Sequence, residues 1–163
     1  MTILCHDLGR RDYAATLRLQ RRLLGRVQRD PSRAYLLLVE HDPPAITLGR
    51  RSREEHLLGS REELAAAGIQ LHEISRGGDV TWHGPGQLVA YPIISLDRGR
   101  KPVHRHVRDL EEVVIRVLRD FGVKGRRRDG LPGVWADDNQ VVGGEIGDGG
   151  DAGAGCGDAA APA

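Results

Sequence analysis

The stretch that decides the fold is RGGDVTWHGPGQ, residues 76–87, where four of twelve residues are glycine. Each glycine loses more backbone entropy on folding than any other residue, so this density needs a reason. Gly77 and Gly78 follow an expected strand over residues 69–75. Without a Cβ, the backbone there can turn sharply and lie directly against a ligand. The stretch therefore predicts a ligand-binding loop.

The second half of this stretch predicts a tight turn. Pro85 and Gly86 stand at the second and third positions of a four-residue turn that begins at Gly84, which suits type II geometry. The chain is expected to reverse there and to enter a strand over residues 88–96. Because Pro92 has no N–H to donate, that strand should lie at a sheet edge or carry a bulge.

Polar and aromatic side chains separate the two glycine pairs. Thr81, Trp82 and His83 offer a hydroxyl, a flat apolar surface and an imidazole, with Arg76 at the entrance. Such a mixture is typical of a pocket that has an apolar wall and a few fixed polar groups. A glycine-rich hairpin whose His and Arg are merely solvated is the alternative that composition leaves open.

Working outward, the pattern alternates strands and helices. Strands are expected over residues 2–8, 35–40 and 45–48, and a helix capped by Asp12 should end near Asp30. Ser60 and Glu63 form a capping box for a helix that ends at Ala67. Apolar residues at helical spacing predict a further helix over residues 106–121, closed by Gly122. These elements predict an α+β fold, a mixed β-sheet with helices packed on one side.

The chain divides into one domain and a tail. Residues 1–142 are long enough to bury a core. In residues 143–163, seventeen of twenty-one residues are Gly, Ala or Asp, and little can be buried to offset the entropy of ordering. We therefore expect a disordered tail over residues 143–163.

Charge is unevenly distributed. The tail carries four acidic residues and no basic one, so the net charge of +1 becomes +5 for residues 1–142. Arginines cluster at Arg50, Arg51 and Arg53 and again at Arg126 to Arg128. These clusters could attract an acidic partner, and a solvated arginine-rich surface is the other interpretation.

Several classes of protein are disfavoured. Cys5 and Cys156 suggest neither a disulfide framework nor a metal site, which indicates a reducing, cytoplasmic location. His104 and His106 point apart at a helix start, so no metal is expected. No apolar run approaches a membrane span. We expect a soluble monomer without cofactor, nucleic-acid partner or membrane contact.

Residues 76–96, RGGDVTWHGPGQLVAYPIISL, resemble the hallmark segment of the lipoyl(octanoyl) transferases, which share a fold with the biotin and lipoate protein ligases. The resemblance extends back to LLLVEHDPPAITLGRR at residues 36–51 and forward to Asp129, Gly130 and the GVW of residues 133–135. It covers the chain from about Leu8 to Trp135.

The resemblance implies a biotin/lipoate protein ligase-like catalytic domain and an acyltransferase of lipoate biosynthesis and protein lipoylation. Its members move an octanoyl group from acyl carrier protein to a lysine of a lipoyl domain, through a thioester on an enzyme cysteine. Expected partners are octanoyl-acyl carrier protein, the lipoyl domains of 2-oxoacid dehydrogenases and the glycine cleavage H protein. The residues implied to line the acyl pocket are Arg76, Gly77, Gly78, Asp79, Val80, Thr81, Trp82 and His83.

The chain departs from the family after Trp135. The family has a lysine in a strand just after GVW and a cysteine in a PCGI segment further on; a lysine near the thiol stabilises the thiolate nucleophile. Here residues 137–147 read DDNQVVGGEIG, and both lysines of the chain, Lys101 and Lys124, precede Trp135. Cys156 has acidic neighbours, which raise a thiol pKa. The catalytic residues are therefore unassigned.

Three interpretations follow. The chain is an octanoyltransferase that recruits an unexpected nucleophile, or a catalytically silent acyl-binding fragment, truncated or read out of frame after about residue 140. The third is an ATP-dependent lipoate or biotin ligase relative, although such ligases typically show a glycine triplet and an HD pair where this chain has SRGG and HG. The family resemblance and an impaired or inactive catalyst are favoured.

Overall fold

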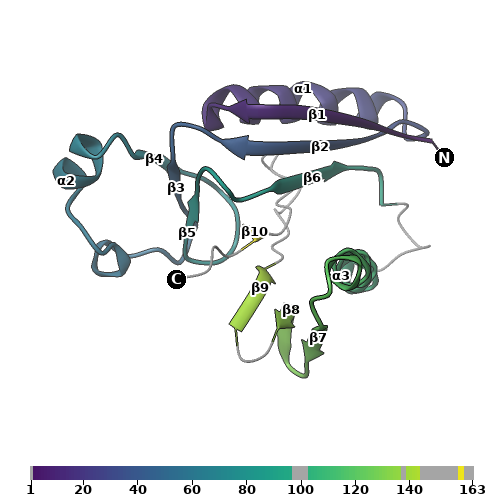
Figure 1. Ribbon diagram of the computed structural model, residues 1–163. Helices are drawn as coiled ribbons and strands as arrows, with labels where there is room; N and C mark the ends of the chain where they lie inside the picture. Colours follow the sequence, from purple (N-terminus) through teal and green to yellow (C-terminus); the bar gives the residue numbers. More distant parts are fainter. Residues whose placement is uncertain (1, 97–102, 137–138, 144–157, 160–163) are drawn as a thin grey trace.

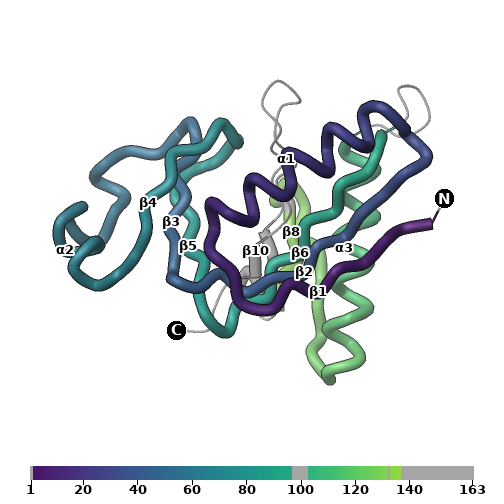
Figure 2. The backbone as a smooth tube through the Cα atoms, turned by 90° about the horizontal axis from the view of Figure 1, so that it is seen from above, coloured from purple at the N-terminus to yellow at the C-terminus, as the bar shows by residue number. Residues whose placement is uncertain are grey.

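A computed structural model describes residues 2–96, 103–136, 139–143 and 158–159. The first layer is a sheet in the order β1-β2-β6, built from β1 (Ile3–Arg11), β2 (Ala34–His41) and β6 (Val89–Ile93). β1 runs parallel to β2, and β6 runs antiparallel to it. Helix α1 (Tyr13–Arg29) lies along one face of this sheet (Figures 1 and 2).

The main core lies between α1 and this sheet. Leu23 and Val27 of α1 pack with Leu37 and Val39 of β2, and burying each such side chain contributes roughly 1.5–3 kcal/mol. Strand β6 forms the edge of its sheet among the described strands, with Pro92 opposite Leu36. The edge position predicted from Pro92 is thus confirmed, because an edge strand can do without one N–H donor.

The second layer is a small sheet in the order β4-β3-β5. The central strand is β3 (Ala45–Leu48), and all four of its residues are buried. Strand β4 (Gln70–Glu73) is parallel to β3, and β5 (Val80–His83) is antiparallel to it. The 3₁₀ turn η1 (Glu54–His56) and helix α2 (Arg61–Ala66) lie to the far side of this sheet from α1 (Figures 1 and 2).

The third layer pairs a helix with an antiparallel sheet. This sheet contains β7 (Gly125–Arg128), β8 (Leu131–Ala136), β9 (Asn139–Gly143) and β10 (Asp158–Ala159), and α3 (Val103–Asp120) packs against β7 and β8. The α+β class is confirmed. The strands form three sheets rather than one, and α1 and α3 cover different sheets.

The predicted helix boundaries are largely confirmed by capping contacts. The Asp12 carboxylate accepts the N–H of Ala15 at 2.7 Å, and both hydrogen bonds of the capping box between Ser60 and Glu63 are present. Gly122 has a φ of +77° at the end of α3, as a C-terminal cap requires. Helix α3 begins at Val103 rather than 106, and the strands expected over 69–75 and 88–96 are shorter.

The tail expected over residues 143–163 lies largely outside the described residues, as does Cys156. In the described part, Asp158 pairs with Gly143 and Ala159 with Val142. The boundary between a domain over 1–142 and a tail stays a prediction.

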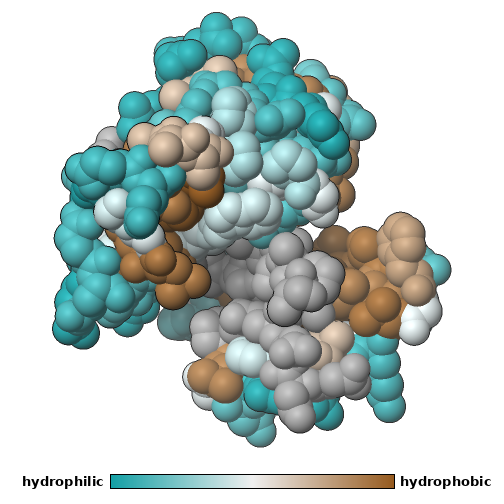
Figure 3. All heavy atoms as spheres, turned by 60° about the vertical axis from the view of Figure 1, so that its left-hand side comes forward, coloured by the Kyte–Doolittle hydropathy of each residue, from teal (hydrophilic) through white to brown (hydrophobic). Residues whose placement is uncertain are grey.

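Apolar side chains remain on the surface of the third layer. Val103, Val113 and Val117 of α3 are exposed, as is Phe121 directly after it, and apolar patches are visible between hydrophilic areas in Figure 3. In the part of the chain that the structure describes, no helix is long and apolar enough to cross a membrane.

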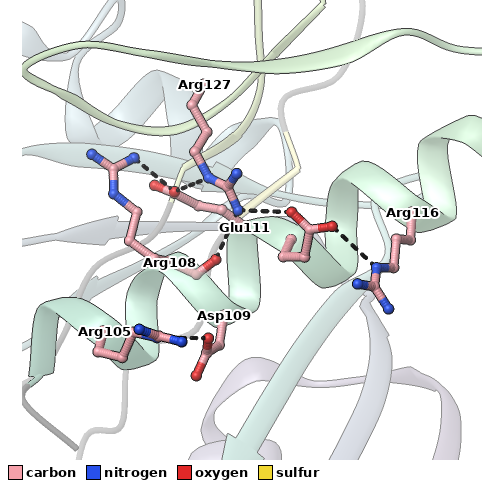
Figure 4. A network of polar contacts seen from close by, with 7 residues as sticks. Arg105, Arg108, Asp109, Glu111, Arg116 and Arg127 are labelled. Carbon is pink, nitrogen blue, oxygen red and sulfur yellow. Dashed lines mark hydrogen bonds and ion pairs between the residues drawn. The ribbon is translucent and has the colours of Figure 1, made fainter.

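A buried carboxylate ties α3 to the sheet beneath it (Figure 4). Glu111 is only 5% exposed and accepts hydrogen bonds from the N–H of Gly133 at 2.9 Å, Arg108 at 2.9 Å and Arg127 at 3.0 Å. Burial alone raises the pKa of Glu111, but these donors outweigh it and hold the pKa below its usual value. Arg127 also bonds Glu112, so two acidic side chains of α3 hold β7.

We expect Glu111→Gln to lower the free energy of unfolding by about 3 kcal/mol. The neutral amide of glutamine removes the buried negative charge to which Arg108 and Arg127 both donate. Urea denaturation measures the loss. Arg105→Gln is the control on the same helix: its pair with Asp109 is exposed, so the change should stay within about 0.5 kcal/mol. Equal effects of the two substitutions would contradict this role of Glu111.

Candidate functional site

The loop that follows β4 is held from beneath by a buried arginine. Arg76 is 8% exposed, and its Nη2 lies 2.6 Å from Thr81 Oγ1, 2.9 Å from Thr47 Oγ1 and 3.0 Å from the carbonyl oxygen of Asp79. Its Nη1 donates to the carbonyl oxygen of Gly77 at 3.0 Å. The guanidinium therefore joins the loop to strands β3 and β5, and it lies inside the protein rather than at an entrance.

Residues 49–51 run alongside the loop and bind its backbone. The N–H groups of Gly49, Arg50 and Arg51 donate to the carbonyl oxygens of Asp79, Arg76 and Gly78 at 3.0–3.1 Å. A Cβ on Gly49 would lie 2.7 Å from the carbonyl oxygen of Gly78, so only glycine fits there. The sequence analysis did not single out Gly49. Its place directly after the buried strand β3 was the sequence feature that could have indicated this close contact.

Strand β5 presents two different faces. Thr81 and His83 point inward, whereas Trp82 points the other way and is 38% exposed. The indole of Trp82 lies over Gly84, where an added Cβ would be 2.3 Å from the ring. The type II turn is supported after it: the N–H of Gln87 donates to the Gly84 carbonyl at 3.1 Å, and Gly86 has a φ of +86°.

The eight residues predicted to line an acyl pocket therefore differ in exposure. That they share one ligand surface stays a prediction. Buried are Arg76, Gly78 and His83; partly buried are Gly77, Val80 and Thr81; exposed are Asp79 and Trp82.

Behind His83 lies a cluster of rings that the sequence analysis did not find. His83 is 4% exposed and His41 0%, and their ring centroids are 5.5 Å apart. Tyr13 lies within 6 Å of the ring centroids of His41, His72 and His83. The cluster joins the start of α1 to the ends of β2 and β5, and pairing between strands distant in sequence is what hid it.

Hydrogen bonds fix the ring orientations of the cluster. His41 Nδ1 lies 3.2 Å from the Arg11 carbonyl oxygen, which can only accept, so Nδ1 carries the proton. In a neutral ring, Nε2 then accepts the hydroxyl of Tyr91 at 2.9 Å. His83 Nδ1 similarly faces Oε1 of Gln87 at 3.2 Å.

Burial keeps this cluster neutral. Desolvation, with smaller contributions from His41 and Arg76, lowers the pKa of His83 to about 4. Burial also lowers the pKa of His41 and of His72. At neutral pH these imidazoles are uncharged, and Arg76 beside them carries the fixed charge.

A polar cavity of about 390 Å³ opens beyond the loop, between β3 and α2. Leu48, Leu57 and Ile74 supply apolar surface to it, and Arg61 is paired there with Glu54 and Glu73.

The predicted basic clusters differ in their surroundings. Arg50, Arg51 and Arg53 are exposed near this cavity, whereas Arg127 is held by Glu111 and Arg128 lies 4.5 Å from the ring centroid of Trp135. Of the first cluster, Arg53 is paired with Glu55 at 2.8 Å.

The described residues contain no group of three or more His, Cys, Asp or Glu side chains that could hold a metal ion. His104 is exposed and His106 partly buried on α3. Cys5 is exposed on β1.

Comparison with known proteins places this loop and its sheets in a family. Residues 12–146 match the family model described as the lipoyl protein ligase A/B catalytic domain. The chain belongs to this family. Among curated relatives, the octanoyltransferase of Chloroflexus aggregans is 48% identical over 134 residues, covering 82% of this chain and 60% of that protein. The octanoyltransferase of Geobacter metallireducens is 43% identical over 140 residues, covering 86% of this chain and 62% of that protein.

The chain thus spans about 60% of the length of these relatives. Solved structures agree on the fold. A bi-partite lipoate protein ligase from Thermoplasma acidophilum aligns with a TM-score of 0.71 at 18% identity, covering 96% of this chain and 59% of that one. Lipoate-protein ligase A bound with ATP aligns with a TM-score of 0.65 at 17% identity, covering 95% and 62%. The ligase-like fold implied by the sequence resemblance is confirmed.

Replacing Arg76 with lysine should lower the free energy of unfolding by about 2–3 kcal/mol, because an ammonium cannot reach the loop carbonyls and both threonine hydroxyls from one position. Arg51→Lys changes an exposed side chain and should stay within about 0.5 kcal/mol. Chemical denaturation of both variants measures these changes. An Arg76→Lys variant as stable as the wild type would contradict the role given to the guanidinium.

Acid should destabilise the protein through His83. Its pKa is lowered from 6.5 to about 4 on folding, so the stability it contributes is complete above pH 6.5 and is lost as the pH falls toward 4. Between pH 7 and pH 5, His83 alone should cost about 2 kcal/mol of unfolding free energy. Denaturation at both pH values should show a smaller loss for His83→Gln than for the wild type. The exposed His104→Gln should leave the loss unchanged, and equal losses in all three proteins would contradict a neutral, buried His83.

Proposed function

We propose that this chain binds the octanoyl group in an octanoyltransferase of lipoate biosynthesis, with octanoyl-acyl carrier protein as donor and a lysine of a lipoyl domain as acceptor. The observation that carries the proposal is the loop of residues 76–79, whose four carbonyl oxygens are all bound from within the protein. The octanoyltransferases at 43–49% identity support the choice of substrate.

In this reaction an amide bond forms between the octanoyl carbonyl carbon and the acceptor lysine nitrogen. The thioester C–S bond breaks, and the carrier thiol leaves with a proton that the lysine gives up. The lipoyl domains of 2-oxoacid dehydrogenases and the glycine cleavage H protein are the proposed acceptors. The reaction takes place in the cytoplasm and needs no metal or cofactor.

The loop and its surroundings suit the acyl group of this donor. Trp82 and Val80 offer apolar surface on one side of β5, and the ring cluster behind His83 is neutral. Neutral rings and apolar side chains favour an alkyl chain, and the buried cation beside them, Arg76, already binds protein oxygens. The eight residues Arg76, Gly77, Gly78, Asp79, Val80, Thr81, Trp82 and His83 are the proposed acyl-binding segment.

The exposed arginines at positions 50, 51 and 53 lie next to this segment and form a basic rim, to which Arg53 contributes less because it is paired with Glu55. Such a rim would steer a negatively charged carrier protein toward the loop. We propose this rim as the docking side for the donor, with the chain acting as a monomer.

Transfer by this chain should be impaired. Residues 136–147, where the resemblance implies a lysine that activates a cysteine, contain no lysine. The chain is accordingly proposed to bind octanoyl donors and to transfer the acyl group slowly or not at all.

Incubation with octanoyl-acyl carrier protein tests this proposal. We expect a complex that weakens at high salt, and no hydroxylamine-labile octanoyl adduct by intact-mass analysis. An adduct that is absent in Cys156→Ser but present in Cys5→Ser would contradict the proposal that the chain is catalytically impaired. It would identify an active transferase. No binding to octanoyl-acyl carrier protein, together with formation of an octanoyl adenylate from octanoate and ATP, would instead favour a ligase.

A further inference from the structure

A histidine and an aspartate form a pair at the exposed end of the loop. His56 ends the 3₁₀ turn η1, and its Nδ1 lies 2.6 Å from Oδ2 and 2.7 Å from Oδ1 of Asp79. The side chains of His56 and Asp79 are 30% and 48% exposed, so the pair is open to solvent. Because Asp79 belongs to the proposed acyl-binding segment, His56 lies at the edge of the surface that would receive the donor.

The contact with Asp79 determines which ring nitrogen of His56 carries the proton. A carboxylate can only accept, so Nδ1 donates, and in the neutral ring Nε2 keeps its lone pair. A second carboxylate faces the ring: Oε1 of Glu55 lies 3.9 Å from Nε2, beyond hydrogen-bond distance, and is bound by Arg53 at 2.8 Å. Nε2 is therefore in a position to accept a proton.

The other histidines near the loop are less accessible to a second protein. His41 is fully buried, and both of its ring nitrogens are engaged. His83 is buried, and desolvation lowers its pKa to about 4, which makes it a weak base at neutral pH. His72 is partly buried against the ring of Tyr13. A base that meets a lysine on another protein must be reachable from solvent, and His56 meets this condition best of the four.

Direct transfer from a thioester to an amine needs a proton acceptor. The lysine attacks the carbonyl carbon as the neutral amine, and its nitrogen becomes positively charged as the C–N bond forms. A base then removes one of the two protons on that nitrogen. The C–S bond breaks with its electron pair on sulfur, and the thiolate takes the proton back from the base. An imidazole whose Nδ1–H is held by a carboxylate suits both transfers, because imidazole gains and loses protons near neutral pH.

We propose that His56 is the general base that takes the proton from the acceptor lysine nitrogen and returns it to the thiol of the carrier protein. Nε2 touches the reacting nitrogen, so His56 is the catalytic residue of this step, and Asp79 is a positioning residue that orients the ring through Nδ1. This route forms no acyl-enzyme, so Cys5 and Cys156 are not required. The inference rests on the proposed function and assigns a residue to the slow transfer that it allows.

Single-turnover transfer from octanoyl-acyl carrier protein to a lipoyl domain tests the inference. Octanoyl-lysine is measured by intact mass from about pH 5 to about pH 8, the range in which an imidazole titrates. His56→Gln removes the base, and Asp79→Asn keeps an acceptor for Nδ1 but removes its charge. A variant that combines Cys5→Ser with Cys156→Ser removes both thiols. His104→Gln, at an exposed histidine of α3, is the control.

At the upper end of this range, the wild type should transfer about 100-fold faster than His56→Gln. The ratio of the two rates should fall toward one as the imidazole is protonated, because deprotonation of the lysine amine affects both proteins alike and cancels. In Asp79→Asn this fall should occur at lower pH, since the carboxylate that favours the imidazolium is gone. The double cysteine variant and His104→Gln should transfer like the wild type, and His56→Gln should still bind the donor.

Three results would overturn the inference. A ratio of wild-type to His56→Gln rates that does not change with pH would indicate a merely structural role for His56. Loss of transfer in the double cysteine variant would indicate an acyl-enzyme instead of direct attack. Binding of octanoyl-acyl carrier protein without transfer above the uncatalysed rate would remove the catalytic role of His56 and leave the proposed binding in place, whereas absence of binding would remove both.

Discussion

The buried guanidinium of Arg76 is the contact on which the site depends. It reaches the hydroxyl of Thr47 on β3, that of Thr81 on β5, and two carbonyl oxygens of its own loop. Removing a charged group from water is costly unless its N–H donors are hydrogen-bonded. Burial of the Arg76 guanidinium therefore requires these acceptor oxygens. The loop conformation follows, because its carbonyls must turn inward to supply acceptors.

The need for acceptors around Arg76 also constrains strand β3 and the residues that follow it. Thr47 can reach Arg76 only because β3 is the central, fully buried strand of its sheet. Gly49 must lack a side chain, since the chain after β3 passes within contact distance of the loop carbonyls. Gly49 therefore serves the close approach of the two backbones, whereas Gly78 has a φ of +86°, a conformation that favours glycine.

The sequence predicted those features that depend on local chemistry. The caps at Asp12 and Ser60 and the turn after Gly84 follow from residues a few positions apart. The loop and its family were identifiable from residues 76–96 alone. The ring cluster was not, because Tyr13, His41, His72 and His83 come from four separate elements. Sequence periodicity cannot show which buried faces meet, and the division of the strands into three sheets was hidden for the same reason.

The electrostatic character of the site narrows what it can bind. His41, His72 and His83 are held neutral by burial, so the rings can form hydrogen bonds without placing further cations beside Arg76. Arg76 itself is turned to carbonyl and hydroxyl oxygens of the protein. A free carboxylate arriving at the loop would lose its hydration without gaining that guanidinium as a new partner. The neutral acyl chain of the proposed donor needs no ionic partner, and Val80 and Trp82 on β5 offer apolar surface for it.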